Sequence, residues 1–232
     1  MATVIDCADS HALLPGMREA RGAIGRGELV VMPTDTVYGI AADAFNPEAV
    51  QRLLDAKGRD RSSPPPVLIP SFAALDALVE RVPRVIATLA DAFWPGPLTI
   101  VMPAQSTLAW DLGDTNGTVA LRMPDQRIAL ELLEDTGPLA VSSANRTGRP
   151  PATTVQQAVE ELGESVSVYL DAGPTPGATP STIVDATAFT VGRGPLRILR
   201  LGALPEAELR DLVPEAFEWL LTPEQLEAEG GG

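Results

Sequence analysis

The sequence predicts an α/β fold built as one domain. Short β-rich runs alternate along the chain with segments in which apolar residues recur at helical spacing, a pattern typical of a sheet covered by helices. A chain of 232 residues is long enough for one sizeable core. The composition, 45% apolar and 21% charged residues, is that of an ordinary globular protein and not of a disordered or fibrous one.

The expected strands are short and spread over the whole chain. The loops between them are rich in proline and glycine, notably Ser62–Pro66, Gly148–Pro151 and Gly173–Pro180, and such loops often hold binding residues. The predicted strands are Thr3–Asp6, Leu29–Met32, Val67–Ile69, Leu98–Met102, Thr118–Arg122, Leu139–Ser142, Val166–Leu170, Thr182–Asp185 and Leu196–Arg200.

Helices are indicated by apolar stripes, each of which should face the sheet. The last of them is expected from Pro205 to Val213, because proline suits a first helical position. The stripes consist of Val50, Leu53 and Leu54; of Ile86, Leu89, Ala90 and Phe93; of Val155, Ala158, Val159 and Leu162; and of Leu209, Leu212 and Val213.

The end of the chain, residues 214–232, is expected to be an acidic and partly disordered tail, which leaves residues 1–213 as the folded domain. The tail ends in glycines and carries one short apolar set, Phe217, Leu220 and Leu221. That set allows one further helical turn before the chain frays.

The net charge of −14 disfavours stable binding of nucleic acid, because phosphate recognition depends on Lys and Arg displacing counterions. Screening acts over about 8 Å at physiological salt, so a local cluster of basic residues still suits a small anion.

Cys7 is the single cysteine, which excludes an internal disulfide and indicates a reducing compartment. With neither a basic leader nor a run of about 18 apolar residues, the protein is expected to be cytoplasmic and not bound to a membrane.

The first polar motif, Pro33 to Gly39, follows a predicted strand and reads PTDTVYG. Its hydroxyls, carboxylate and phenol suit a turn that presents several polar groups to one small ligand. Taken alone, the motif fits an ordinary Asx or Ser/Thr turn slightly better.

The second motif, Lys57-Gly58-Arg59-Asp60-Arg61, ends the helix that carries Leu53 and Leu54. Lys57 continues the apolar stripe by one turn, so its side chain should emerge near the sheet. Closely spaced lysine and arginine side chains suit a polyphosphate. The alternative is a cationic helix end that interacts with the helix dipole, worth about 0.3–1 kcal/mol.

The third motif, Ser142 to Gly148, reads SSANRTG and directly follows an apolar strand. Hydroxyls, an amide and free backbone N–H groups at a strand end suit a phosphate or adenine pocket, although an ordinary polar strand exit explains them equally well. A nucleophilic serine is not expected, because no Gly-x-Ser-x-Gly elbow is present and His11 is the single histidine. The sequence also lacks a P-loop motif.

Between Leu29 and Gly202 the chain resembles one known family in an ordered series of segments. Read in order, they are PTDTVYG, AVQRLLDAKGR, FWPGPLTIVM, TVALRMP, PLAVSSANRTGRPPATT, STIVD and ILRLG. On these segments the chain resembles the YrdC-like threonylcarbamoyl-AMP synthases. The resemblance implies a twisted mixed sheet with helices on its faces and a concave, locally basic cavity in residues 1–213.

The resemblance also implies a reaction and its partners. L-threonine, bicarbonate and ATP, the co-substrate, give threonylcarbamoyl-AMP and pyrophosphate, with magnesium expected alongside the triphosphate. A tRNA threonylcarbamoyl-transferase complex then uses the product to modify an adenosine near the anticodon. For such a reaction the protein needs to supply positioning and charge stabilisation.

Carried over position by position, the family signature falls on residues from all three motifs. Those expected to hold the triphosphate and adenylate, and hence to be catalytic, are Lys57, Arg59, Ser143 and Asn145. Further nucleotide contacts are expected from Ser63, Thr118 and Arg200. Arg122 is expected to pair with the threonine carboxylate, because the guanidinium is a planar donor and the carboxylate a planar acceptor. Substrate contacts are expected from Thr34, Thr36, Tyr38, Arg122 and Ser181. No protein metal site is expected.

Some positions depart from the family pattern. Ser63 stands where an asparagine often contacts ATP, and Leu68 replaces a histidine near threonine. A turn that usually reads Arg-Pro-Gly is Arg200-Leu201-Gly202 here. These departures leave two alternatives open: a related carbamoyl-adenylate-forming enzyme with another substrate, and a noncatalytic RNA- or ribosome-associated module, which the net charge disfavours.

Overall fold

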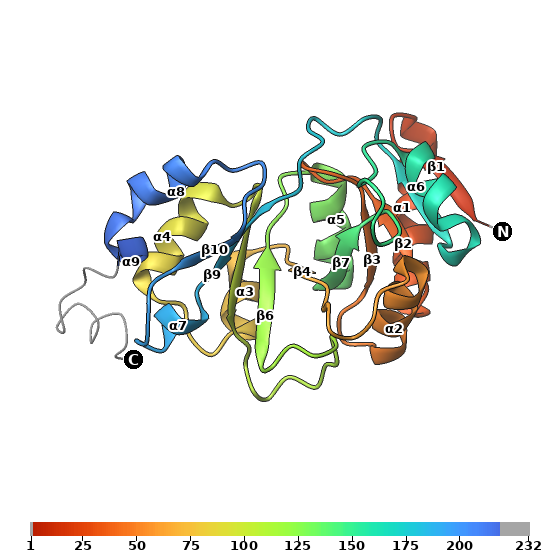
Figure 1. Cartoon of the computed structure of the whole chain (residues 1–232). Helices are drawn as coiled ribbons and strands as arrows, with labels where there is room; N and C mark the ends of the chain where they lie inside the picture. Colours follow the sequence, from red (N-terminus) through yellow and green to blue (C-terminus); the bar gives the residue numbers. More distant parts are fainter. Residues whose placement is uncertain (1, 219–232) are drawn as a thin grey trace.

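The computed structural model describes residues 2–218 as an α/β fold around one ten-stranded mixed sheet (Figure 1). The strand order is β1-β8-β2-β3-β7-β4-β6-β5-β9-β10. Parallel and antiparallel pairs alternate irregularly across it, which makes the sheet mixed. The strands are β1 (Thr3–Asp6), β2 (Val30–Met32), β3 (Gly39–Asp43), β4 (Val67–Leu68), β5 (Leu98–Pro103), β6 (Thr118–Arg122), β7 (Leu139–Ser143), β8 (Val168–Asp171), β9 (Thr182–Asp185) and β10 (Arg197–Arg200).

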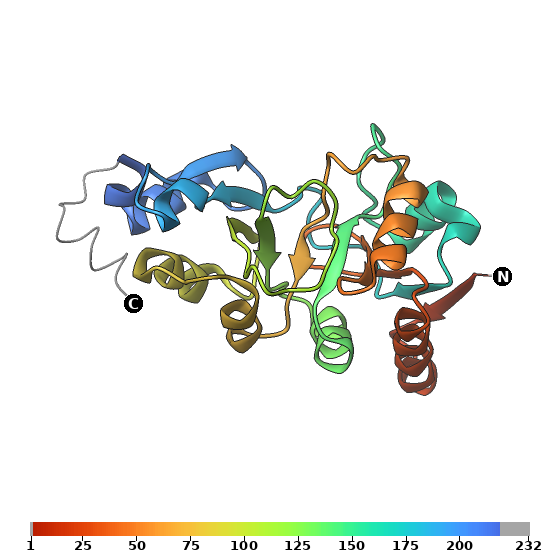
Figure 2. The ribbon, with the colours of Figure 1, turned by 90° about the horizontal axis from the view of Figure 1, so that it is seen from below.

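Helices cover both faces of the sheet, with α1 and α5 on one side and α2 and α6 on the other (Figure 2). None of the helices within residues 2–218 is long and apolar enough to cross a membrane. The helices are α1 (Ser10–Gly25), α2 (Pro47–Lys57), α3 (Phe72–Leu78), α4 (Arg84–Phe93), α5 (Arg127–Thr136), α6 (Val155–Leu162), α7 (Thr187–Thr190), α8 (Glu206–Leu212) and α9 (Pro214–Glu218), with a 3-10 turn at Gly163–Ser165.

Alternation along β2 explains why each face has its own core. Val30 and Met32 pack with α1 and α5, whereas Val31 packs with α2 and α6. Side chains of a strand point alternately to opposite faces, so a continuous apolar run is needed where both faces are covered. A third core forms around β5 and β6, with α3, α4, α8 and α9 against it.

Strand β4 is the narrowest part of the sheet. Its two residues, Val67 and Leu68, pair with β7 on one side and β6 on the other. They join a half made of β1, β8, β2, β3 and β7 to a half made of β6, β5, β9 and β10. The connection from β8 to β9, residues 172–181, passes from the first half to the second along the upper side of Figure 1.

A strand lies at or close to each position predicted from the sequence, and the helices around Leu53, Leu89, Val159 and Leu209 are confirmed. The sequence prediction missed β3, α1, α3, α5 and α7. Strand β3 reads GIAAD, whose alanines have no strand preference, and it forms because β2 and β7 pair with it from both sides. Helix α1 was obscured by Pro15 and several glycines within it.

The expected domain boundary at residue 213 lies too early. Residues Pro214–Glu218 form α9, where Ala216 and Phe217 are buried in the core around β5. The Phe217 ring also lies 5.0 Å from the Arg210 guanidinium carbon. The helical turn expected after Val213 is therefore part of the folded unit, and the expected disordered tail, 219–232, lies outside the described residues.

Replacing Phe217 with alanine should lower the free energy of unfolding by about 3 kcal/mol or more, because the ring is only 8% exposed. Leu14, which is 67% exposed on α1, is the matched control, and Leu14→Ala should change stability by less than about 0.5 kcal/mol. Urea titration followed by circular dichroism measures both. Equal stability of wild type and Phe217→Ala would show that α9 is not part of the folded unit.

Candidate active site

A cavity of about 350 Å³ lies where the two halves of the sheet meet. Its walls come from the turn before β3, the segment after α2, Pro64–Pro66, β6, β7, the start of β9 and the end of β10. The volume is within the range of small-molecule sites, and sites in α/β folds commonly lie at strand ends. Every polar motif predicted from the sequence contributes to this cavity or to its support.

The turn before β3 is held by its own hydroxyls. Thr34 Oγ1 accepts hydrogen bonds from the N–H groups of Thr36 and Val37 and donates one to the Val37 carbonyl at 2.6 Å. This is the Ser/Thr turn that the local sequence favours. Both threonines also line the cavity, so the turn combines the structural role with a place in the site.

Tyr38 lines the cavity, but its hydroxyl points elsewhere. The hydroxyl donates to the Gly173 carbonyl at 2.6 Å and accepts from Ala172 N–H at 3.1 Å. It anchors the connection between β8 and β9 to the turn before β3. Burial is the main reason that the pKa of Tyr38 rises to about 12, so the phenol remains protonated.

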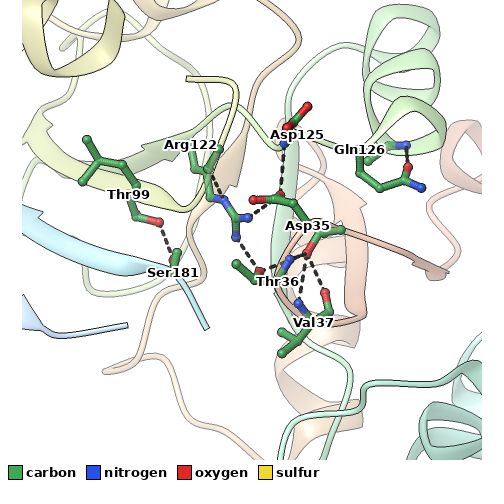
Figure 3. Close-up of polar contacts among 12 residues, drawn as sticks. Asp35, Thr36, Val37, Thr99, Arg122, Asp125, Gln126 and Ser181 are labelled. Atoms are coloured by element: carbon green, nitrogen blue, oxygen red, sulfur yellow. Dashed lines mark hydrogen bonds and ion pairs between the residues drawn. The ribbon is translucent and has the colours of Figure 1, made fainter. Parts of the chain in front are cut away.

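Arg122, at the end of β6, reaches across the cavity to the other half of the sheet (Figure 3). Its Nη2 donates to Asp35 Oδ1 at 2.5 Å, Nη1 to Thr36 Oγ1 at 3.0 Å and Nε to the Gly96 carbonyl at 2.9 Å. The Arg122 side chain is only 7% exposed, and the Asp35 side chain that faces it only 12%. Arg122 is therefore fixed in orientation before any ligand binds.

Lys57 is completely buried at the end of α2. Its ammonium donates to the Ser143 carbonyl and, at 2.6 Å, to the Asn145 carbonyl. The expectation that Lys57 emerges near the sheet is confirmed, since these bonds join α2 to the exit of β7. Burial, with help from the nearby charge of Arg59, lowers the pKa of Lys57 to about 7.

Gly58 turns the chain so that Arg59 enters the cavity. It adopts the left-handed conformation, with φ of 61°, and the Arg59 N–H bonds back to the Leu54 carbonyl. Glycine is favoured there because side chains disfavour positive φ. Arg59 Nη1 then donates to Ser142 Oγ at 3.3 Å, which brings the second and third motifs together.

Asn145 supports the loop after β7 and does not line the cavity. Its Nδ2 donates to the carbonyls of Arg146 and Arg149, both at 2.8 Å. Within the described chain its Oδ1 is buried without a hydrogen-bond partner. The serines before it, Ser142 and Ser143, do line the cavity.

Arg200 is held beside Ser181 at the end of β10. Its Nε and Nη2 donate to the Ser181 carbonyl at 3.1 and 2.8 Å, and Ser181 Oγ lies 2.8 Å from Thr99 Oγ1 (Figure 3). A Cβ at Gly202 would collide with the backbone of Pro180 and Ser181. Glycine is therefore required at this position of the turn.

The cavity is suited to an anion. The described residues that line it include three arginines, Arg59, Arg122 and Arg200, and they include no Asp or Glu. Burial lowers the pKa of all three arginines, and the charge of Arg59 adds to this effect at Arg200. Arginine remains protonated in proteins, so these shifts record unfavourable burial of charge that a bound anion would relieve.

Most predicted site residues meet in this cavity. Lys57, Ser63 and Asn145 are the exceptions: Lys57 and Asn145 lie behind the wall, and Ser63 is exposed before the prolines that form it. The sequence prediction did not select Asp35, Ser142 or Thr99. Asp35 lies in the motif from Pro33 to Gly39 and Ser142 in the motif from Ser142 to Gly148, whereas Thr99 had no sequence signal beyond its strand. Residues predicted in the lining and found there are Thr34, Thr36, Tyr38, Arg59, Thr118, Arg122, Ser143, Ser181 and Arg200.

A twisted mixed sheet whose strand ends surround a hollow of arginines and hydroxyls places the chain in the YrdC-like class of α/β proteins. The chain belongs to the Sua5/YciO/YrdC family, whose model, described as "Telomere recombination", matches residues 22–202.

Curated relatives carry consistent names. A Mycobacterium tuberculosis protein, provisionally named threonylcarbamoyl-AMP synthase, is 48% identical over 92% of this chain and 96% of its own length. The threonylcarbamoyl-AMP synthase of Pyrococcus abyssi is 38% identical over 86% of this chain and 57% of its own length.

Solved structures agree with the fold. Sua5 of P. abyssi complexed with L-threonine has a TM-score of 0.83 and 34% identity over 93% of this chain and 62% of that chain. YciO of E. coli has a TM-score of 0.75 over 88% of this chain and 98% of that chain; at 19% identity it supports the fold alone. The chain thus spans about three fifths of Sua5.

The buried ammonium of Lys57 should make stability depend on pH. Its pKa falls from 10.5 to about 7 in the folded protein, so between these values the unfolded chain binds more protons. The contribution of Lys57 to stability is therefore lowest below pH 7 and increases as the pH rises towards 10.5.

Thermal unfolding of wild type and Lys57→Met from pH 6 to pH 9 measures this effect. The difference in Tm should move in favour of the wild type as the pH rises, because methionine does not titrate. Arg21→Met removes an exposed cation and should give a difference that does not vary in this way. A constant difference for Lys57→Met would contradict the pKa shift.

Proposed function

We propose that this protein is an L-threonylcarbamoyladenylate synthase, which condenses L-threonine, bicarbonate and ATP to threonylcarbamoyl-AMP and pyrophosphate. The observation that carries the proposal is that Arg59, Ser143 and Arg200 converge with Arg122 on one cavity. The names of the relatives and the threonine complex of P. abyssi Sua5 support the same reaction. Because the chain covers only part of Sua5, its activity is tested on the chain itself.

The nucleotide is assigned to the wall formed by Arg59, Ser143, Thr118 and Arg200. Charged and hydroxyl donors there suit the triphosphate, and the neighbouring Pro64–Pro66 segment provides an apolar surface suited to a base. The amino acid is assigned to the part of the cavity between Arg122, Thr36 and Ser181. A planar guanidinium suits the threonine carboxylate.

The reaction needs two bond-forming steps. The threonine amine attacks the carbon of carbon dioxide derived from bicarbonate, which gives a carbamate and releases a proton to water. A carbamate oxygen then attacks the α-phosphorus of ATP, and the bond to the leaving pyrophosphate breaks. The arginines hold both partners close together and stabilise charge as it develops on the phosphates.

Lys57 and Asn145 act on the reaction through the wall and not by touching the nucleotide. Lys57 holds the carbonyls of Ser143 and Asn145, and Asn145 holds the loop beyond them. Together they place Ser142 and Ser143 opposite Arg59. The role assigned to them is positioning.

Magnesium belongs to the proposal only as the ion that accompanies ATP. Residues 2–218 contain no cluster of His, Cys, Asp and Glu side chains that fits a metal, and the described lining provides no carboxylate ligand. Phosphate oxygens and water would therefore be its ligands, as is common for magnesium. No catalytic step is assigned to the metal.

Selection of threonine is assigned to hydroxyls and to an apolar wall. Leu68, which replaces the family histidine, and Val141 both line the cavity, and these apolar side chains suit the threonine methyl group. A methyl group contributes about 1–3 kcal/mol to discrimination, so serine is the competitor that is hardest to exclude.

The product is proposed to pass to a tRNA threonylcarbamoyl-transferase complex. A cytoplasmic location is proposed from the single cysteine.

Pyrophosphate release tests the proposed reaction directly. The full chain should release pyrophosphate from ATP only when L-threonine and bicarbonate are both present, because the carbamate is the nucleophile. Mass spectrometry should identify threonylcarbamoyl-AMP as the product. Release that continues unchanged without threonine would refute the proposal.

Arg59→Ala should reduce kcat by about 100-fold or more, the effect of removing one donor that stabilises developing charge. Arg61→Ala is the matched control, since Arg61 lies two residues further on and pairs with Asp111 at the surface. Its turnover should stay close to wild type. Normal turnover of Arg59→Ala, measured by the same pyrophosphate assay, would remove Arg59 from the site.

A further inference from the structure

The geometry points to Asp35 as a positioning residue that fixes the Arg122 guanidinium for the carboxylate of the amino-acid substrate. This inference rests on the proposed function and adds Asp35 to the residues assigned to the amino-acid site. Asp35 acts through Arg122, and we assign it no contact with the substrate.

Asp35 connects three segments around the site. Its Oδ1 accepts from Arg122 Nη2 at 2.5 Å and from the Asp125 N–H at 3.0 Å (Figure 3). Asp35 belongs to the turn between β2 and β3, Arg122 ends β6, and Asp125 leads into α5. The ion pair therefore links the two halves of the sheet beside the cavity.

The surroundings of Arg122 leave little freedom for its side chain. A guanidinium has five N–H groups, and here the Gly96 carbonyl, the Thr36 hydroxyl and the Asp35 carboxylate each accept from one of them. All three bonds have a cationic donor, but only the bond to Asp35 joins it to an anion, so Asp35 is the dominant restraint. Two N–H groups remain for a ligand in the cavity that Arg122 lines.

Charge alone predicts the opposite effect for Asp35. Its negative charge reduces the attraction of Arg122 for a substrate carboxylate, because like charges repel strongly where solvent is excluded. If this effect dominated, neutralising Asp35 would tighten threonine binding. If orientation dominates, as the fixed geometry indicates, the same change weakens threonine binding.

Asp35→Asn separates these effects, because it keeps the shape of the side chain and removes its charge. We expect the KM for threonine to rise roughly 10- to 100-fold, the usual consequence of a misplaced contact. The KM for ATP should change less than about twofold, since Arg59 and Arg200 are assigned to the nucleotide. A purely structural defect would instead lower kcat through loss of active protein, without a selective change in one KM.

A double-mutant cycle shows whether Asp35 acts through Arg122. In an Arg122→Lys background, Asp35→Asn should change the threonine KM by much less than in wild type, because the guanidinium that it positions is absent. Asp135→Asn is the matched control, since it removes a carboxylate from an exposed pair with Arg21. It should leave both KM values unchanged.

The outcomes separate this inference from the proposed function. If wild type releases no pyrophosphate in response to threonine, the proposed function fails. If wild type is active but Asp35→Asn has an unchanged or lower threonine KM, the positioning role fails alone. If Asp35→Asn is unfolded by circular dichroism, Asp35→Glu provides the same comparison with the charge displaced, and an unchanged threonine KM there also overturns the inference.

Discussion

The buried ammonium of Lys57 is the interaction on which the site depends. Removing a charge from water is unfavourable, and it is tolerated here because two carbonyl groups accept hydrogen bonds from the ammonium. Those carbonyls belong to Ser143 and Asn145, so the bonds fix the end of α2 against the exit of β7. Arg59 then projects towards Ser142 because Gly58 reverses the chain immediately after Lys57. One desolvated group thus determines how two distant motifs face each other.

The cavity lies beside β4, the narrowest part of the sheet. Where β4 contributes only two residues, the neighbouring strands β6 and β7 are not joined along their whole length, and space remains at their ends. Polar side chains from both halves occupy the edges of this space. Arg122 and Asp35 then restore across the cavity a connection that the backbone does not provide.

Much of this architecture follows from local pattern. The strands around Thr118 and Thr182 were predicted with the bounds that the structure shows, because β-branched runs are bounded there by turn residues. Strand β3 could not be found in this way, since its alanines gain their extended conformation from pairing on both sides. The choice of site residues depended on the resemblance, because hydroxyls in turns look the same whether they cap a backbone or face a ligand.

The roles of individual residues required coordinates. Sequence placed Lys57 and Arg59 together, yet one side chain is completely buried and the other enters the cavity. Side chains two residues apart at a helix end point in different directions. The left-handed conformation of Gly58 increases the difference in direction between Lys57 and Arg59. Likewise, Asp35 resembled a turn residue, and only its distance to Arg122 shows that it bridges the halves.

The connection between β8 and β9 links the two halves of the sheet covalently and spans most of its width. β8 is the second strand of the sheet and β9 the ninth, so the sheet path between them is roughly 34 Å at about 4.8 Å per strand. Residues 172–181 reach at most about 36–40 Å when fully extended. Part of that reach is taken up where Gly173 and Thr175 are tied to Tyr38 and Thr153. The connection therefore has little length to spare beyond the path across the sheet, and it ties the two halves together through the covalent chain as well as through β4.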